Sequence, residues 1–195
     1  MYQNVEATRQ VVEVFLGECL MHNAPFLIEP AVSEELLVQS SLTLDLLRVN
    51  QGKIVTAESC TGGLVAAALT HHAGSSDVTE GGFVTYSNLM KQVVLGVRET
   101  TLVQYGAVSA ETVSEMAEGA LRMAPDATVA VSVSGIAGPS GGSVSKPVGL
   151  VWFATAVRNG PTVSDAQNFA GDRTRVRSLA ALHALLLVGQ RLERE

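Results

Sequence analysis

Few cysteines, few aromatic side chains and few charges distinguish this sequence, and each shortage excludes a class of protein. Its 195 residues include two cysteines, Cys19 and Cys60, whose separation fits neither a zinc motif nor a disulfide framework. Aromatic residues make up 5% and charged residues 16% of the chain, whereas apolar residues reach 47%. That balance is typical of a compact α/β globule rather than a disordered or fibrous chain, and the unlinked thiols predict a reducing, cytoplasmic location.

Basic residues and long apolar runs are also scarce. The formal net charge of −6 argues against a nucleic acid as the main partner, because neutralising phosphates requires clustered Lys and Arg; a small anion could still bind locally. Glu13 and Glu18 interrupt the apolar stretch VVEVFLGECLM, and no other segment approaches the roughly 20 apolar residues that a membrane span requires. We therefore expect neither a signal peptide nor a membrane partner.

The hydrophobic pattern predicts five strands with helices between them. Residues 1–32 are expected to form an N-terminal extension with a helix at about 6–21, and residues 33–195 to form one domain. Strands are predicted at residues 53–57, 81–87, 127–135, 148–157 and 162–171, and helices at 33–52, 60–74, 88–97, 109–124 and 172–193. The turn residues RNGP between the last two strands predict a hairpin. The fold class is therefore α/β, a three-layer α/β/α sandwich with a mixed, mostly parallel sheet of about five strands.

The stretch AESCTGG, residues 57–63, lies between the first predicted strand and a helix, where open α/β sheets bind ligands. Unpaired backbone N–H groups at a helix start can hold an anion or an oxyanion, and glycines let the backbone approach closely. Ser59 or Cys60 could then be a nucleophile. The alternative is structural, with Ser59 or Thr61 as a helix cap and Gly62 and Gly63 allowing close packing. The Walker loop, the dinucleotide fingerprint and the G-x-S-x-G motif are all absent.

The stretch TYSNLMK, residues 85–91, places Tyr86 at a strand end and Lys91 in the first turn of the next helix, for which Asn88 is the expected cap. A serine nucleophile needs a base, and a lysine can act as one if burial lowers its pKa. Tyr86 could relay the proton or orient the amine. The alternative for Lys91 is a solvated surface charge.

Residues 134–149, SGIAGPSGGSVSKPVG, form an unusually long glycine-rich loop between two buried strands. The loop could close over a nucleotide-like phosphate and ribose, with Lys146 supplying charge, or it could be a flexible connection. Asp172 is expected to cap the last helix, whose Arg173, Arg175 and Arg177 form either a basic patch near a phosphate or a solvated helix end. Adjacent His71 and His72 cannot share a metal on a helix, and His183 is expected in a core or an interface.

Taken in order, AESCTGG, YSNxxK, GAVS, SGIAGPSGG, KPVG and GDR resemble the C-terminal domain of the CinA proteins, the nicotinamide-mononucleotide deamidase family. The resemblance covers about residues 33–193. The sequence lacks the large pyrophosphatase-like N-terminal domain of full-length CinA proteins, so the resemblance implies a stand-alone deamidase. The first 30 or so residues depart from the family pattern, and nothing is carried over onto them.

The resemblance implies hydrolysis of nicotinamide mononucleotide to nicotinic acid mononucleotide and ammonia, with Ser59 as nucleophile, Lys91 as base and Tyr86 assisting. It implies a homodimer, and neither a metal nor another cofactor is expected. The residues expected to bind substrate or oxyanion are Glu58, Cys60, Thr61, Gly62, Gly63, Asn88, Gly135, Gly138 and Arg173.

Three alternatives remain open. Cys60 is a rival nucleophile, although the local motif offers no histidine to activate a thiol. The chain could instead be an inactive nucleotide-binding or interaction module of the same fold. It could also be a Ser/Lys amidase for another small amide.

Overall fold

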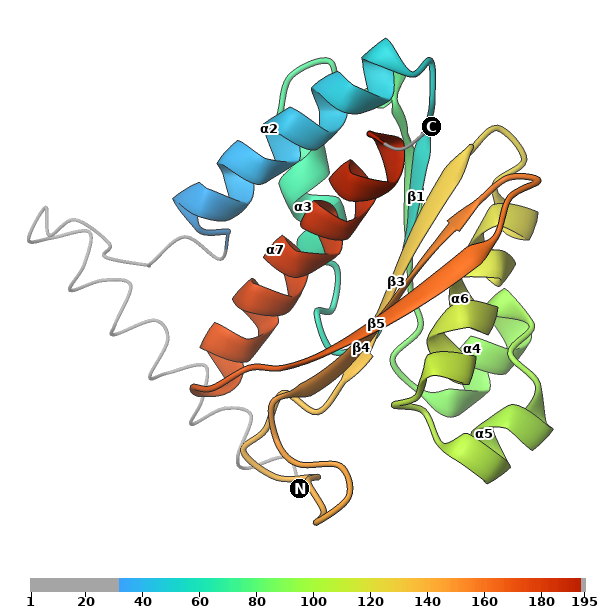
Figure 1. Ribbon diagram of the computed structural model, residues 1–195, viewed down its shortest axis with the longest axis vertical. Helices are drawn as coiled ribbons and strands as arrows, with labels where there is room; N and C mark the ends of the chain where they lie inside the picture. The colour runs from blue at the N-terminus through green and yellow to red at the C-terminus, as the bar shows by residue number, and fades with distance from the viewer. Residues whose placement is uncertain (1–31, 194–195) are drawn as a thin grey trace, which may run out of the picture. The chain divides into compact units, whose positions relative to one another are not determined.

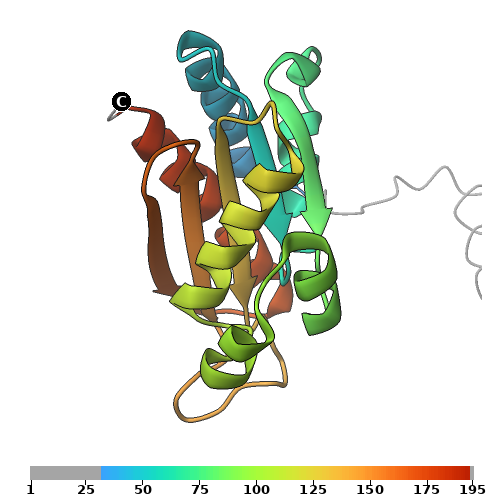
Figure 2. The ribbon, with the colours of Figure 1, turned by 90° about the vertical axis from the view of Figure 1, so that its right-hand side faces the viewer.

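The five predicted strands form one sheet, in the order β2–β1–β3–β4–β5 (Figures 1 and 2). This computed structural model describes residues 32–193, so the helix expected at residues 6–21 lies outside the described residues. β1 pairs in parallel with β2 and β3, whereas β4 runs antiparallel to β3 and β5. The strands are β1 (Ile54–Glu58), β2 (Thr79–Val84), β3 (Val129–Gly135), β4 (Leu150–Val157) and β5 (Thr162–Asn168). The predicted mixed sheet and its terminal hairpin are confirmed.

Helices cover both faces of this sheet. Figure 1 shows α2 (Glu34–Val49), α3 (Leu64–Thr70) and α7 (Arg173–Leu192) on one face. Figure 2 looks onto the opposite face, which carries α4 (Asn88–Leu95), α5 (Glu99–Tyr105) and α6 (Ala110–Met123). A short 3₁₀ helix, η1 (Ser75–Asp77), precedes β2. The predicted three-layer α/β/α sandwich is therefore confirmed; across residues 32–193, the helices lack the combination of length and apolar character needed to cross a bilayer.

Alternation along the central strands sends side chains into two cores. Val131 and Val133 of β3 pack with the helices α2, α3 and α7, whereas Ala130, the residue before Val131, packs on the side of α6. Because helices cover both faces, every residue of β1 and all but the last residue of β3 are buried. Alanines dominate the strand positions facing α6, so this helix can lie close to the sheet.

Side-chain caps begin four of the helices. Ser33 accepts from the N–H of Leu36 and Asp172 from that of Arg175, as predicted, and Ser109 caps α6 in the same way. The prediction that Asn88 caps α4 is wrong. Ser87 is the cap, because its backbone is extended and its Oγ accepts from the N–H of Met90 at 3.2 Å.

Two predicted boundaries also shift. The helix expected at 60–74 is shorter, because residues 60–63 form a turn and the helix begins at Leu64. The strand expected at 81–87 starts and ends earlier, as β2. That earlier end frees residues 85–87 to connect the strand to α4.

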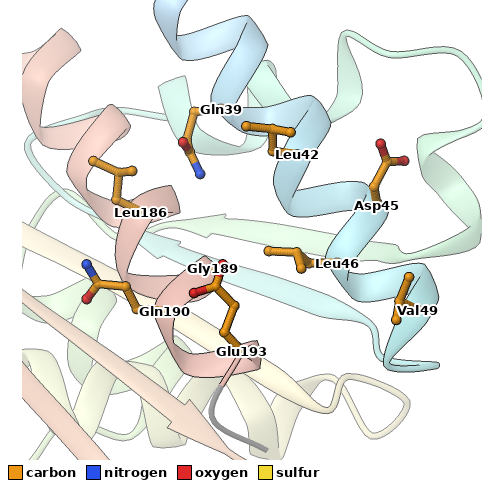
Figure 3. A pocket seen from close by; sticks show the side chains of 9 residues that line it. All are labelled: Gln39, Leu42, Asp45, Leu46, Val49, Leu186, Gly189, Gln190 and Glu193. Carbon is orange, nitrogen blue, oxygen red and sulfur yellow. The ribbon is translucent and has the colours of Figure 1, made fainter.

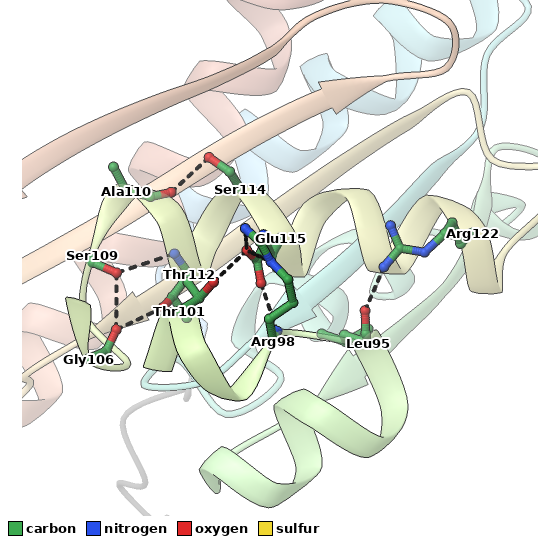
Figure 4. Close-up of polar contacts among 10 residues, drawn as sticks. All are labelled: Leu95, Arg98, Thr101, Gly106, Ser109, Ala110, Thr112, Ser114, Glu115 and Arg122. Carbon is green, nitrogen blue, oxygen red and sulfur yellow. Dashed lines mark hydrogen bonds and ion pairs between the residues drawn. The ribbon is translucent and has the colours of Figure 1, made fainter. Parts of the chain in front are cut away.

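A helix that the pattern did not reveal, α5, is attached to α6 by polar contacts (Figure 4). The Glu115 carboxylate accepts from the backbone N–H and guanidinium of Arg98 and from the Thr101 hydroxyl. Arg122 donates at 3.0 Å to the carbonyl of Leu95, the last residue of α4. These contacts hold the α4–α5 segment against α6.

Candidate active site

Ser59 and Lys91 meet at the carboxyl end of β1. Ser59 directly follows this strand, and Lys91 lies in the first turn of α4, after β2. Lys91 Nζ donates to Ser59 Oγ over 3.0 Å. Since β1 and β2 are parallel neighbours, both strands end at the same edge of the sheet, which brings together two residues far apart in sequence.

Lys91 is buried without a carboxylate partner. The residue is 1% exposed, and its ammonium also donates to the carbonyls of Thr85 at 2.8 Å and Tyr86 at 3.5 Å. None of the ion pairs formed within residues 32–193 includes it. Burial therefore lowers the pKa of Lys91 from 10.5 to about 8. The alternative of a solvated surface lysine is wrong.

Glu58, the last residue of β1, is engaged with the start of α3. Its buried carboxylate accepts from the N–H groups of Gly63, Val65 and Ala66 at 2.9, 3.1 and 2.9 Å. A carboxylate is favourable there because it satisfies helix N-terminal donors and faces the positive end of the dipole. Glu58 and the Gly63 N–H thus bind each other, rather than a substrate or an oxyanion as expected. The alternative that Ser59 or Thr61 caps this helix is wrong, since the N-cap is Gly63.

Two glycines shape the turn after Ser59. Gly62 and Gly63 have φ values of 62° and 97°, in the left-handed region that favours glycine. The Gly62 N–H donates to the Ser59 carbonyl at 3.1 Å. The N–H groups of Cys60 and Thr61 face the Cys60 sulfur, and within the described chain they have no oxygen acceptor. Because a thiol sulfur is a weak acceptor, both N–H groups are candidate donors to an oxyanion.

Arg177 of α7 holds the carbonyl groups of the same turn. Its Nε donates to the Cys60 carbonyl at 3.1 Å and its Nη2 to the Thr61 carbonyl at 2.8 Å. Arg173 lies one helical turn before it and shares its face of α7, whereas the charge of Arg175 acts on Glu35 of α2. Of the three arginines, Arg173 and Arg177 therefore lie beside the site and Arg175 does not. No signal in the sequence distinguished Arg177 from the other two.

Cys60 is a poor candidate for the nucleophile. It is 6% exposed, and burial raises the pKa of its thiol to about 11. A thiol with that pKa stays protonated at neutral pH, and the thiolate is the reactive form.

Arg173 links Tyr86 to the glycine-rich loop. Its Nη1 donates to the Gly138 carbonyl at 3.0 Å and its Nη2 to the Tyr86 hydroxyl at 3.1 Å. Tyr86 is 61% exposed and touches the Lys91 ammonium with its backbone carbonyl. Arg173 thus connects two other predicted site residues, Tyr86 and Gly138, and Tyr86 in turn contacts Lys91. Asn88 lies exposed at the start of α4.

The glycine-rich loop is tied to its surroundings. A Cβ on Gly135 would lie 2.6 Å from Val151 Cγ2, so this glycine allows β3 and β4 to approach closely. Gly138 has a φ of 85°. Lys146 Nζ donates to the carbonyls of Tyr105 at 2.6 Å and Val108 at 2.7 Å. Lys146 therefore joins the loop to the α5–α6 connection, rather than supplying free charge to a phosphate as expected.

The histidines among residues 32–193 make their contacts away from this site. His72 contacts the Ser40 hydroxyl at 2.7 Å, and His183 packs against Phe153 and contacts Asp165 at 2.7 Å. His183 is thus packed against the core as predicted. Residues 32–193 contain no cluster of potential metal ligands.

A shallow groove of about 390 Å³ lies between α2 and α7 (Figure 3). It is mainly apolar, and none of its residues belongs to the Ser59–Lys91 site. The lining residues are Gln39, Leu42, Asp45, Leu46, Val49, Leu186, Gly189, Gln190 and Glu193. The groove contributes no group to the chemistry of the site.

Fold and site together define a three-layer α/β/α protein with a serine hydroxyl bonded to a buried lysine where parallel strands end. Such a pair can supply a nucleophile and its base. The chain belongs to the CinA C-terminal domain family, whose model matches residues 38–192. The resemblance seen in the sequence motifs is confirmed.

Relatives and solved structures agree with this assignment. The chain is 54% identical over 155 residues to the nicotinamide-nucleotide amidohydrolase PncC of Enterobacter agglomerans, covering 79% of this chain and 94% of the relative. It is 51% identical over 156 residues to PncC of Escherichia coli K12, covering 80% and 94%. The crystal structure of a competence/damage inducible protein from Agrobacterium tumefaciens superposes with a TM-score of 0.79 at 42% identity, covering 83% of this chain and 98% of that one.

Proposed function

We propose that this protein is an amidohydrolase that converts nicotinamide mononucleotide and water to nicotinic acid mononucleotide and ammonia, with Ser59 as nucleophile and Lys91 as base. The names of the relatives, which are identical to this chain at about half of the aligned positions, support the reaction. The observation that carries the mechanism is the buried Lys91 amine, 3.0 Å from Ser59 Oγ, with a pKa of about 8. An amine with that pKa is partly neutral near physiological pH and can accept a proton.

Acylation begins from the neutral form of Lys91. Ser59 Oγ attacks the carboxamide carbon while its proton passes to Lys91 Nζ. The N–H groups of Cys60 and Thr61 hold the oxyanion that forms. When the tetrahedral intermediate collapses, the C–N bond breaks, Lys91 returns the proton to the departing nitrogen and ammonia leaves.

Deacylation repeats these steps with water. Lys91 takes a proton from a water molecule, the water oxygen attacks the acyl carbon, and the ester bond to Ser59 Oγ breaks. The proton on Lys91 returns to Ser59, and the product leaves as the carboxylic acid, which loses its remaining proton to the solvent. Each cycle consumes one amide and one water, and Lys91 carries the protons that move during the two chemical steps.

Arg173 and the glycine-rich loop are the proposed ligands of the nucleotide phosphate. Arg173 is exposed, and its guanidinium, with five N–H donors, binds one carbonyl and one phenol among the described residues. It therefore has donors available for a phosphate on the same side of the site as Tyr86. Tyr86 helps to orient the Lys91 amine through its carbonyl and accepts a hydrogen bond from Arg173 with its hydroxyl. The homodimer and the cytoplasmic location stay predictions.

The first experiment is to measure ammonia release from nicotinamide mononucleotide by the purified wild type, Ser59→Ala and Lys91→Met. We expect each variant to lose at least about a thousand-fold in kcat, because nucleophile and base act as a unit. Cys60→Ala is the matched control and is expected to keep most of the activity, since its buried thiol takes no part in the reaction.

Each proposed assignment has a result that would overturn it. A wild type that binds the nucleotide but releases no ammonia is a binding module. Loss of activity in Cys60→Ala together with full activity in Ser59→Ala would transfer the nucleophile to the thiol. Activity on other small amides but not on the nucleotide would support the alternative Ser/Lys amidase.

A further inference from the structure

Arg177 donates hydrogen bonds to the turn after Ser59, residues 60–63, but not to Ser59 or Lys91, the proposed catalytic pair. Its two bonds go to the carbonyls of Cys60 and Thr61, and the interactions recorded for Lys91 do not include it. The guanidinium comes from α7, which packs beside α3 on one face of the sheet (Figure 1). A residue so far along the chain thus determines how residues 60 and 61 are oriented.

The rest of the turn is anchored by other groups. The Ser59 N–H donates to the Val133 carbonyl at 2.9 Å, which fixes the end nearest β1. Glu58 binds the N–H groups at the start of α3, which fixes the other end. Between these anchors, the hydrogen bond from Arg177 to the Cys60 carbonyl restrains the peptide unit joining Cys60 and Thr61, and the bond to the Thr61 carbonyl restrains the next one.

Peptide geometry makes that restraint matter for the chemistry. In a trans peptide, the carbonyl of one residue and the N–H of the next lie in the same plane and point in opposite directions. Holding the Cys60 carbonyl toward Arg177 therefore aims the Thr61 N–H away from Arg177. This N–H has no oxygen acceptor among residues 32–193, and its recorded neighbour is the Cys60 sulfur, a weak acceptor. The hydrogen bond from Arg177 to the Cys60 carbonyl is therefore the stronger restraint on its direction.

We propose that Arg177 is a positioning residue of the amidohydrolase, holding the Cys60–Thr61 peptide so that the Thr61 N–H meets the oxyanion of the transition state. The inference rests on the proposed function. Oxyanion donors act through preorganised direction, so loss of the restraint weakens transition-state binding far more than substrate binding. Gly62 fits the same arrangement, because a Cβ there would lie 3.3 Å from Arg177 Nη2.

The kinetic test compares Arg177→Met, Arg177→Lys and the matched control Arg175→Met, which removes an exposed arginine two positions earlier on the same helix. We expect Arg177→Met to lower kcat about 100-fold, as loss of one oxyanion donor does in other enzymes, while KM changes less than about threefold. Arg177→Lys keeps the charge but cannot make both hydrogen bonds, so its kcat is expected to lie between those of Arg177→Met and the wild type. Arg175→Met should match the wild type.

A second readout does not depend on the substrate. Phenylmethylsulfonyl fluoride modifies a reactive serine: Ser59 Oγ bonds to sulfur, fluoride leaves, and the hydroxyl proton passes to Lys91. The negative charge that develops on the sulfonyl oxygens uses the same N–H donors. The rate of Ser59 labelling, followed by mass spectrometry, should fall in Arg177→Met and stay unchanged in Arg175→Met.

The two proposals fail separately. A wild type that releases no ammonia, yet labels at Ser59 in an Arg177-dependent way, removes the substrate assignment and keeps the positioning role. A wild type that is active, with a folded Arg177→Met variant equal to it in both kcat and labelling rate, overturns the positioning role. A drop in thermal stability alone, with kcat kept in the folded fraction or in Arg177→Lys, would make Arg177 purely structural and also overturn the inference.

Discussion

At the scale of single residues, the charge state of Lys91 controls the proposed reaction. Its burial among backbone carbonyls, with no ion-pair partner among residues 32–193, lowers the pKa to about 8. The base must be neutral to accept the Ser59 proton, so the fraction of active enzyme falls tenfold for each pH unit below that value. We expect kcat/KM to rise through pH 8 and to level off above it.

Ammonia release at low substrate concentration between pH 6 and about 9.5 measures this profile. The phosphate of the substrate ionises near pH 6, about two units below the expected midpoint, so the two ionisations can be separated. Arg175→Met should reproduce the wild-type curve. A midpoint near pH 6 would mean that Lys91 is not the titrating base.

The sequence indicated Ser59 and Lys91 because both follow predicted parallel strands, and parallel strands end at a common edge. It did not indicate the role of Glu58, since the N–H groups that this carboxylate binds belong to residues whose turn geometry depends on the φ values of Gly62 and Gly63. The roles of Arg177 and Lys146 could not be predicted from the sequence either. Their partners are carbonyl groups, which every residue carries and which no sequence pattern identifies.

At the scale of secondary structure, the close approach of α6 to the end of α4 depends on Gly119. A Cβ at this position would overlap the carbonyl oxygen of Leu95 and lie 2.8 Å from its carbon. In Gly189 of α7, by contrast, an added Cβ would meet Leu46 Cδ1 at 3.6 Å, an ordinary contact. The two glycines are therefore a matched pair, both inside helices and different only in their surroundings.

Alanine replaces both glycines in the corresponding test. Gly189→Ala is expected to stabilise the protein by up to about 1 kcal/mol through helix propensity. Gly119→Ala has the same propensity gain but must push α4 and α6 apart, so we expect a net destabilisation of about 1–3 kcal/mol. Urea unfolding measures both free energies. Equal stabilisation by the two substitutions would show that the Leu95 contact relaxes without cost.

Long periodic elements were predictable at this scale, and polar short ones were not. The apolar spacing of α6 and the nearly continuous apolar run of β4 identified both elements. α5 has seven residues and is fixed to α6 mainly through Glu115, a tertiary contact that leaves no periodic signal. The early end of β2 likewise follows from pairing with β1 rather than from its own composition.

At the scale of the whole molecule, burial of the protonated Lys91 amine lowers the free energy of unfolding. Helices cover both faces of the sheet, so the carboxyl end of β1 lies in a setting where water cannot fully solvate a charge. Below pH 8 the amine is protonated in both the folded and the unfolded chain, and the folded chain alone bears the desolvation penalty. Between pH 8 and 10.5, folding releases the proton, so stability rises with pH.

Replacing Lys91 by Met removes this ionisation while nearly preserving the side chain's volume. A shift from 10.5 to about 8 corresponds to about 3 kcal/mol, so the free energy of unfolding of Lys91→Met relative to wild type should decrease by most of that amount between pH 7 and pH 10. The variant also leaves the Thr85 carbonyl without its donor, a constant offset that does not alter the slope. Lys53→Met, at a surface lysine paired with Glu80, controls for loss of a lysine. The free energies come from chemical unfolding at each pH. A difference that does not change with pH would show that the charge on Lys91 does not destabilise the folded protein. It would also contradict the lowered pKa on which the proposed role as a base depends.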